Sequence, residues 1–247
     1  MSGRFRRAIL IRAEARQATA EVEDDFHHFR VTLDYADSRV TAARGQGVRY
    51  PWSQCPMAGL ALADLAGLPL GPDPTAVYRH ADPLGQCTHM LEIAGLAVTQ
   101  AARGPGQRRY DAAVSDPVDG RVEAELLCDG AALARWTLQD GVIVAPADRA
   151  GQRPAQFRSS ALRELPPQEA EILLILRRAI GLAAARRLDV DQFPTAAAMG
   201  RPPACFVFSP KVAERAARRY GSERDFSDGP GPLAAPPSPA PTAGETP

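Results

Sequence analysis

Lysine is almost absent from this chain, because Lys211 is the only lysine among 29 basic residues. A Schiff-base mechanism is therefore excluded at every other position, and the arginine bias is typical of a GC-rich bacterial genome. The formal net charge is zero over 247 residues, so no overall field would hold nucleic acid or an anionic membrane. No stretch approaches the roughly 20 apolar residues that a membrane span needs.

Targeting signals and cofactor fingerprints are also missing. The apolar run Ala8–Ile11 is too short for a secretory signal, and Arg12 follows it directly. We therefore expect a cytoplasmic protein whose four cysteines are reduced thiols. Gly104-Pro105-Gly106 lacks the Lys-Ser/Thr that completes a phosphate-binding loop, and no dinucleotide fingerprint occurs. The sequence thus predicts no cofactor.

Alternating apolar and polar residues indicate antiparallel strands in the first third and in the middle of the chain. The clearest case is Phe29-Arg30-Val31-Thr32-Leu33, which has the pattern of a half-buried strand. Asp119-Gly120 and Asp129-Gly130 are typical of tight turns between neighbouring strands. Strand signals cover residues 5–13, 18–35, 39–42, 109–115, 121–128 and 133–144.

Helical spacing of apolar residues predicts helices at 55–67, 88–102, 161–188 and 210–220. For the first of these, one face would contain Met57, Leu60, Ala61, Leu65 and Leu68. The predicted fold class is α+β, an antiparallel sheet or meander packed by three or four helices. Residues 1–226 would form a single domain. Residues 227–247 are rich in Pro, Ala and Gly and are expected to be a disordered tail.

Several separated motifs resemble a proteobacterial group known as domain-of-unknown-function family 2889. They are Asp24–Phe29, Arg49–Ala58, Cys87–His89, Cys205–Pro210 and Gly221–Phe226, in this order along the chain. The resemblance covers most of residues 15–226 and implies one shared fold over that span. It also implies, through an association of the group, a part in the bacterial breakdown of aromatic compounds.

Histidine and cysteine supply the candidate catalytic groups. His28 and His89 are the preferred acid–base residues, because imidazole titrates close to neutral pH. Strand alternation places His27 and His28 on opposite faces, and His28 is the one we assign to the site; a solvent-facing strand residue is the alternative. His89 at a helix start should stay neutral. Cys87 precedes the same helix and would be a nucleophile with His28 or His89, or else a buried structural thiol.

Substrate-binding groups are predicted in the segment that opens at Arg49. Arg49 and Tyr50 would hold a carboxylate or a phenolate, and Trp52 would stack on an aromatic ring. A packed turn is the alternative. Asp25 or Asp24 would orient an imidazole, with Asp25 assigned to the site, and Cys55 would line the same pocket. A metal site built from Cys55, Cys87, His89 and either His80 or His28 lacks any CxxC or HxxxH spacing, so we predict no metal.

The sequence therefore favours a cofactor-independent acid–base enzyme. We expect a lyase that cleaves a C–C bond in a small aromatic, lignin-derived type of compound, with His28 as the general base and Tyr50, Cys87 and His89 assisting. Its partner would be a small-molecule substrate, without nucleic acid or membrane, and a homodimer is conceivable. The alternatives are a non-enzymatic ligand-binding or adaptor protein and a metal-assisted hydrolase with Cys and His ligands.

Overall fold

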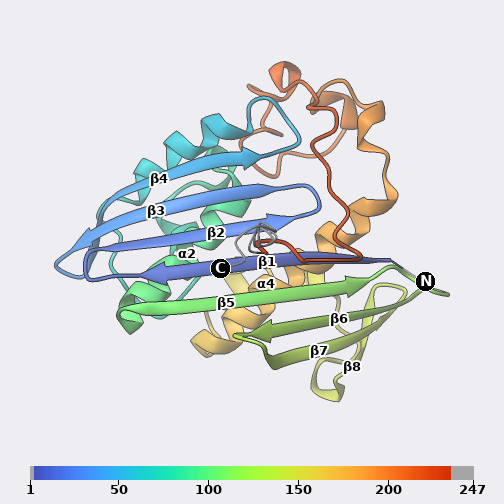
Figure 1. Cartoon of the computed structure of the whole chain (residues 1–247), viewed down its shortest axis with the longest axis horizontal. Helices are drawn as coiled ribbons and strands as arrows, with labels where there is room; N and C mark the ends of the chain where they lie inside the picture. Colours follow the sequence, from blue (N-terminus) through green and yellow to red (C-terminus); the bar gives the residue numbers. More distant parts are fainter. Residues whose placement is uncertain (1–2, 235–247) are drawn as a thin grey trace, which may run out of the picture.

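A computed structural model describes residues 3–234 of the chain. It is built around a single antiparallel sheet of eight strands in the order β4-β3-β2-β1-β5-β6-β7-β8. This arrangement and its packing helices confirm the predicted α+β class (Figure 1). Within the described residues, no helix is long and apolar enough to span a bilayer.

The strands follow one another as hairpins in two groups. Asp119-Gly120, Asp129-Gly130 and Asp140-Gly141 all have positive φ, which two-residue hairpin turns of this type require. The two predicted tight turns are therefore confirmed, and a third separates β7 from β8. The strands are β1 (Arg4–Ala13), β2 (Gln17–Asp24), β3 (His28–Ala36), β4 (Arg39–Arg49), β5 (Gly106–Ser115), β6 (Arg121–Cys128), β7 (Ala131–Gln139) and β8 (Val142–Ala145).

Strand β1 joins the two groups at the centre of the sheet. On one side β1 pairs with β2, and on the other it pairs with β5 from Arg4↔Ser115 to Ala13↔Gly106. The strands that meet at this ladder are far apart in the sequence. The protein therefore has one continuous core instead of two separate lobes.

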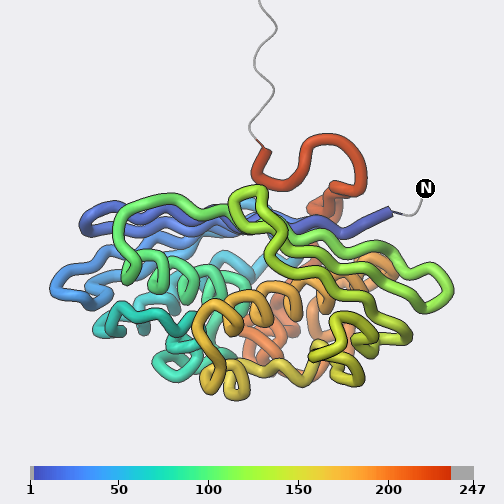
Figure 2. The backbone as a smooth tube through the Cα atoms, turned by 90° about the horizontal axis from the view of Figure 1, so that it is seen from below, coloured from blue at the N-terminus to red at the C-terminus, as the bar shows by residue number. Residues whose placement is uncertain are grey.

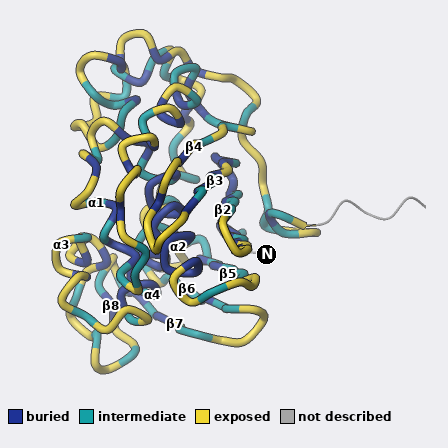
Figure 3. Tube along the Cα trace, turned by 90° about the vertical axis from the view of Figure 1, so that its left-hand side faces the viewer, coloured by how far each residue is buried: buried dark blue, intermediate teal, exposed yellow. Residues whose placement is uncertain are grey.

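Two long helices cover one face of the sheet, as Figure 2 shows. Helix α2 (Thr88–Arg103) packs on β1, β2 and β3, and helix α4 (Pro167–Ala183) packs on β1, β5 and β6. Every residue of α2 from Met90 to Ala101 is buried, so this helix lies at the centre of the core (Figure 3). The helices predicted at 88–102 and 161–188 therefore exist, the second with a shorter regular part.

The other predicted helices differ from the structure. Residues Cys55–Leu65 form a 3₁₀ helix, η1, whose buried residues include Ala58, Leu62 and Leu65 while Met57 and Leu60 are exposed. Residues 210–220 contain a single 3₁₀ turn, η8 (Ala213–Arg215). The other short helices are α1 (Val77–His80), η2 (Pro83–Gly85), η3 (Ala147–Arg149), η4 (Pro154–Gln156), α3 (Ser159–Leu162), η5 (Ala184–Arg187), η6 (Val190–Gln192) and η7 (Ala197–Met199).

Residues 227–234 cross the face of the sheet that the two long helices leave open (Figures 1 and 2). Arg6 donates hydrogen bonds to the carbonyls of Phe226 and Gly229, and Arg109 donates to those of Pro232 and Leu233. We call residues 227–234 the C-terminal strap. The rest of the predicted tail, 235–247, lies outside the described residues.

Candidate functional site

The cavity that we take as the candidate site has a volume of about 70 Å³ and is lined by imidazoles, thiols and aromatic rings. It lies where the β2–β3 turn, the start of η1, the N-terminus of α2 and residues 205–208 meet. The imidazoles are His27 and His89. The convergence expected between the Arg49–Ala58 region, the opening of α2 and one imidazole from an early strand is therefore present.

The early imidazole in this cavity is His27 and not His28. Phe29, Val31 and Leu33 of β3 are buried toward α2, and a side chain two residues before Phe29 shares its face. His28 points to the open face, where its Nε2 donates to Glu21 at 2.6 Å. The assignment of His28 as general base is thus wrong in position, because His28 and His89 lie on opposite faces of the sheet.

A buried carboxylate orients the His27 ring. His27 Nδ1 lies 3.0 Å from Asp24 Oδ1, which also accepts the main-chain N–H groups of Phe26 and His27. Although burial alone would raise it, the pKa of Asp24 is held well below its usual range by His27, by Arg7 and by the Phe26 hydrogen bond. The ionised carboxylate therefore accepts the Nδ1 proton, which leaves Nε2 as the basic nitrogen of a neutral His27 ring.

His89 stacks on His27 at the N-terminus of α2. Their ring centroids are 4.0 Å apart with an angle of 30° between the planes. The pKa of His89 is well below its ordinary value, chiefly because of burial, with His27, Arg178 and Arg7 adding to the effect. The neutral state that the sequence predicted is therefore supported, although burial and not the helix dipole is its main cause. Nδ1 of His89 is buried and has no hydrogen-bond partner among residues 3–234.

Three of the four cysteines also line the cavity: Cys55, Cys87 and Cys205. Burial raises the pKa of Cys87 to about 12 and that of Cys55 well above its usual value. The position of Cys87 before a helix was expected to stabilise a thiolate, but desolvation is the larger effect here. The structure therefore argues against Cys87 as a nucleophile. Cys205 was not among the predicted site residues, because it lies far along the sequence from the other residues that line the cavity.

Aromatic rings form the remaining wall. Trp52 lies edge-on to Phe208, with centroids 6.2 Å apart, and Phe29 and Phe206 complete the lining. The indole of Trp52 also has the guanidinium of Arg218 over it, 5.8 Å from the ring centroid. Trp52 and Cys55 are thus placed where the sequence predicted, and Phe206 and Phe208 also contribute to the lining.

The predicted anion-binding residues lie elsewhere. Arg49 donates to the main-chain oxygens of Asp24, Asp25 and His27 and to that of Ser222. Arg49 therefore holds the β2–β3 turn that contains His27. Its guanidinium has a structural role and does not bind substrate. Tyr50 does not line the cavity, and the Arg219 guanidinium lies 5.0 Å from its ring centroid.

Asp25 also points away from the cavity. Its carboxylate pairs with Arg186, and burial raises its pKa to about 6. The aspartate that orients an imidazole is its neighbour Asp24. Asp24 was the alternative named for this role. The choice of His27 over His28 and of Asp24 over Asp25 follows from one turn, whose backbone closes with a hydrogen bond from Asp24 N to His27 O.

A metal centre fits this arrangement poorly. Within residues 3–234, the group with possible ligand atoms inside 4.8 Å of one another is Asp24, His27 and His89. Both oxygens of Asp24 are already engaged, by His27 and by Arg7. Imidazole lone pairs lie in the ring plane, so two rings stacked at 30° do not aim at one point. The alternative set is not assembled either, since His80 bonds to the carbonyl of Ala66.

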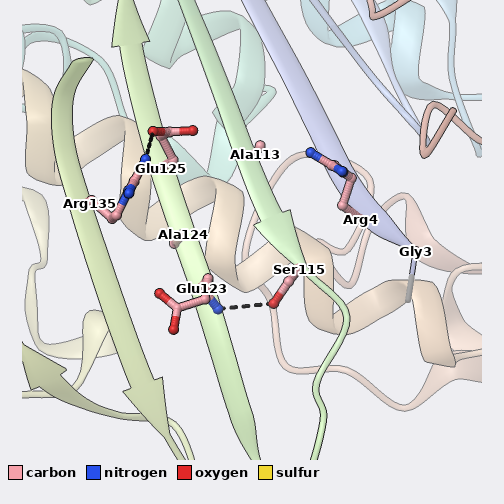
Figure 4. A pocket seen from close by; sticks show the side chains of 8 residues that line it. All are labelled: Gly3, Arg4, Ala113, Ser115, Glu123, Ala124, Glu125 and Arg135. Atoms are coloured by element: carbon pink, nitrogen blue, oxygen red, sulfur yellow. Dashed lines mark hydrogen bonds and ion pairs between the residues drawn. The ribbon is translucent and has the colours of Figure 1, made fainter. Parts of the chain in front are cut away.

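Larger hollows exist on the open face of the sheet, and they lack such groups. One of about 370 Å³ is lined by Arg4, Glu123, Glu125 and Arg135 among others (Figure 4). Arg135 pairs with Glu125, and Arg121 pairs with Glu123. These two glutamates are therefore held in ion pairs on the open face of the sheet. The hollow has no histidine or cysteine in its lining.

Fold and site together define an α+β protein in which one antiparallel sheet, covered on one face, presents a stacked imidazole pair to a small buried cavity. Residues 8–103 match the family described as "Protein of unknown function (DUF2889)". This match confirms the resemblance for the motifs that lie within residues 8–103. No curated protein matches the chain. The matched segment contains both imidazoles, whereas Cys205, Phe206 and Phe208 lie outside it.

Proposed function

We propose that this protein is a cofactor-independent acid–base enzyme, a lyase that cleaves a C–C bond in a small aromatic compound. The observation that carries the proposal is the Asp24–His27 hydrogen bond beside a neutral His89 in a buried cavity. A carboxylate that fixes the tautomer of a histidine, with the second nitrogen free, is a common arrangement for a general base. Here the free nitrogen is Nε2 of His27.

In this proposal the proton moves from oxygen to carbon. Nε2 of His27 accepts the proton of a substrate hydroxyl. The carbon that bears this hydroxyl becomes a carbonyl as its bond to the neighbouring carbon breaks. The electron pair of the broken bond stays on the second fragment, where an adjacent aromatic ring or carbonyl delocalises it. His27 then returns the same proton to that carbon. The sum is an alcohol converted into an aldehyde or ketone and a C–H product, so no oxidant, reductant or water is consumed.

His89 would assist as a neutral hydrogen-bond donor. A neutral imidazole can donate to the oxygen that becomes the carbonyl without delivering its proton. The low pKa of His89, caused mainly by burial, keeps the ring uncharged at neutral pH. His27 and His89 therefore have distinct tasks although their rings touch.

The cavity also supports a preference for uncharged reacting groups. Among residues 3–234, the cavity lining includes no arginine and no lysine, so a carboxylate placed there would be desolvated without a cation from these residues. The volume of about 70 Å³ is less than half of the roughly 150 Å³ in which benzene is known to bind. We therefore expect a hydroxymethyl-sized group to enter the cavity beside the stacked imidazoles, while the aromatic body of the substrate contacts Trp52 and Phe208.

The test compares two adjacent histidines. Aromatic alcohols with a β-hydroxy side chain are screened with the purified protein, and carbonyl release is detected with a hydrazine reagent. With any compound that turns over, His27→Ala should lose about 10²–10⁴-fold in rate, the usual contribution of a general base. His28→Ala, on the other face of the sheet, should lose less than about tenfold.

Equal losses in both variants, or nearly full activity of His27→Ala, would refute the assignment. Elemental analysis of the same preparation separates the metal-assisted alternative, which requires stoichiometric metal and inactivation by a chelator. Tight binding of the aromatic compounds without carbonyl release, unchanged in His27→Ala, would favour a ligand-binding protein.

A further inference from the structure

Four alternating charges are buried between the sheet and the two long helices. Arg7 of β1 pairs with Asp24 of β2, and it also lies 3.4 Å from Oε2 of Glu92 in α2. The same Glu92 oxygen accepts a hydrogen bond of 2.8 Å from Arg178 of α4. The side chains of Arg7, Asp24 and Glu92 are fully inaccessible, and that of Arg178 is 18% exposed. We call these four residues the charge chain.

The two ends of the charge chain reach the two imidazoles. At one end Asp24 accepts the hydrogen bond of His27 Nδ1. At the other end Arg178 donates to the side-chain hydroxyl and to the carbonyl of Thr88, the residue before His89. The chain therefore connects β1, β2, α2 and α4 to the two imidazoles.

Stability alone does not account for such a chain. Desolvating four charges costs several kcal/mol per ion, and well-packed apolar residues in place of a buried ion pair are often as stable or more so. The chain carries two positive and two negative charges, so it is neutral as a whole. Removal of one member would leave an uncompensated charge next to the imidazole pair, and its sign would depend on which member is lost.

We infer that Glu92 and Arg178 are positioning residues of the candidate site, which hold the imidazole pair in place and set the electrostatic potential at it. The inference rests on the proposed function for its purpose. Its physical content, a dependence of imidazole protonation on two residues that do not line the cavity, can be measured without any substrate.

The charged and titratable groups around the pair come from every neighbouring element. They are Asp24 of the β2–β3 turn, Arg7 of β1, Glu92 and Cys87 of α2 and its N-cap, Arg178 of α4, Cys55 of η1 and Cys205 of the C-terminal loop. Burial keeps the thiols Cys55 and Cys87 protonated, because it raises the pKa of each. Replacing Glu92 by a neutral residue therefore makes the local charge more positive by one unit, and replacing Arg178 makes it more negative by one unit.

The experiment is an NMR titration of the full-length protein labelled with ¹³C at the histidine rings. The chain has four histidines, so each ring signal can be assigned by single substitution. Glu92→Gln leaves an excess positive charge and should lower the pH at which the His27–His89 pair takes up its first proton. Arg178→Gln leaves an excess negative charge and should raise that pH. A shift of about 0.5–1 pH unit is expected for one charge across a few side chains.

The double variant Glu92→Gln/Arg178→Gln removes a neutral pair and should return the titration to within about 0.3 unit of the unaltered protein. The matched control is the exposed pair Arg135 and Glu125 (Figure 4), where Glu125→Gln and Arg135→Gln should leave the titration unchanged. Circular dichroism of each variant establishes that it is folded, and either single variant that folds is sufficient for the test, because the sign of its shift is fixed in advance.

Shifts of the same sign in both single variants, or no shift in either, would overturn the inference. Such a result would not touch the proposed function, which is judged by carbonyl release from His27→Ala and His28→Ala. Conversely, opposite shifts in a protein without lyase activity would leave the charge chain established and the reaction refuted.

Discussion

At the scale of single residues, the site depends on which of two adjacent histidines faces the core. The alternation of side chains along a strand predicts that only one of the two histidines can face the core, and the structure confirms this. The buried side chains Phe29, Val31 and Leu33 share their parity with His27, so the sequence contained the signal that selects it. Cys205 and Arg178 could not be found in this way, because their contacts arise from tertiary packing alone.

The neighbouring Asp25 gives a prediction about stability and pH. Burial raises its pKa to about 6, so the stability it contributes is fully present below its unfolded value near 3.8 and is lost as pH rises through about 6. The stability of Asp25→Asn relative to the unaltered protein should therefore increase between pH 4 and 7. We expect a change of about 1–3 kcal/mol, measured by urea unfolding at several pH values.

Asp225 provides the matched control on the same arginine, Arg186. Its pKa is lowered, mainly by hydrogen bonds from Ser227, so its contribution is present above the unfolded pKa and is lost as pH falls. The relative stability of Asp225→Asn should change with pH in the opposite direction. Parallel slopes for the two variants would contradict the assignment of Asp25 as a buried, costly carboxylate.

At the scale of elements, strands were predicted better than helices, for a physical reason. Strand periodicity and Asp-Gly turns act over a few residues, and the turns at 119–120 and 129–130 fixed the second hairpin group. The apolar residues of the segment at 55–65 indicate a helix but do not distinguish a 3₁₀ helix from an α-helix. Its 3₁₀ form depends on close packing against β4, which no local pattern records. The expected helix at 210–220 fails similarly, since that segment instead makes strand-like bridges to Trp52 and Thr195.

Close contact between η1 and β4 makes Gly59 a sensitive position. A Cβ atom at Gly59 would lie 2.3 Å from the carbonyl oxygen of Gly45, and a backbone atom cannot yield as a flexible side chain does. Gly59→Ala should therefore destabilise the protein by about 1–3 kcal/mol, the usual cost of overpacking, as read from thermal or urea unfolding.

The control for this substitution is Gly181→Ala in α4, where an added Cβ meets no atom within 4 Å. Alanine is favoured over glycine inside a helix by roughly 0.5–1 kcal/mol, so this variant should be slightly more stable. If Gly59→Ala were as stable as the unaltered protein, the proposed close docking of η1 on the sheet would be incorrect.

At the scale of the whole molecule, the sheet has one face covered by helices and one face crossed by the C-terminal strap. The domain was predicted to end at residue 226, and the structure describes eight further residues with specific contacts. Glu23 accepts the N–H of Leu233, and Arg109 donates to Pro232 and Leu233. A chain cut after Phe226 should therefore unfold at a lower urea concentration than the full chain. Its free energy of unfolding should be smaller by about 1–3 kcal/mol.

A chain cut after Ala234 retains all of these contacts and is the control, expected to match the full-length protein. Equal stability of all three chains would mean that the strap adds nothing and that the domain ends at residue 226 as predicted. Urea midpoints at one protein concentration are sufficient to decide between these outcomes.

The ladder between β1 and β5 has a consequence for synthesis on the ribosome. Strand β1 emerges first, and β2 can pair with one of its edges at once. The other edge waits until Gly106–Ser115 has been translated, and in that interval its main-chain N–H and C=O groups are available to other chains. We therefore expect the nascent N-terminal half to be prone to edge-to-edge association until β5 pairs with this edge.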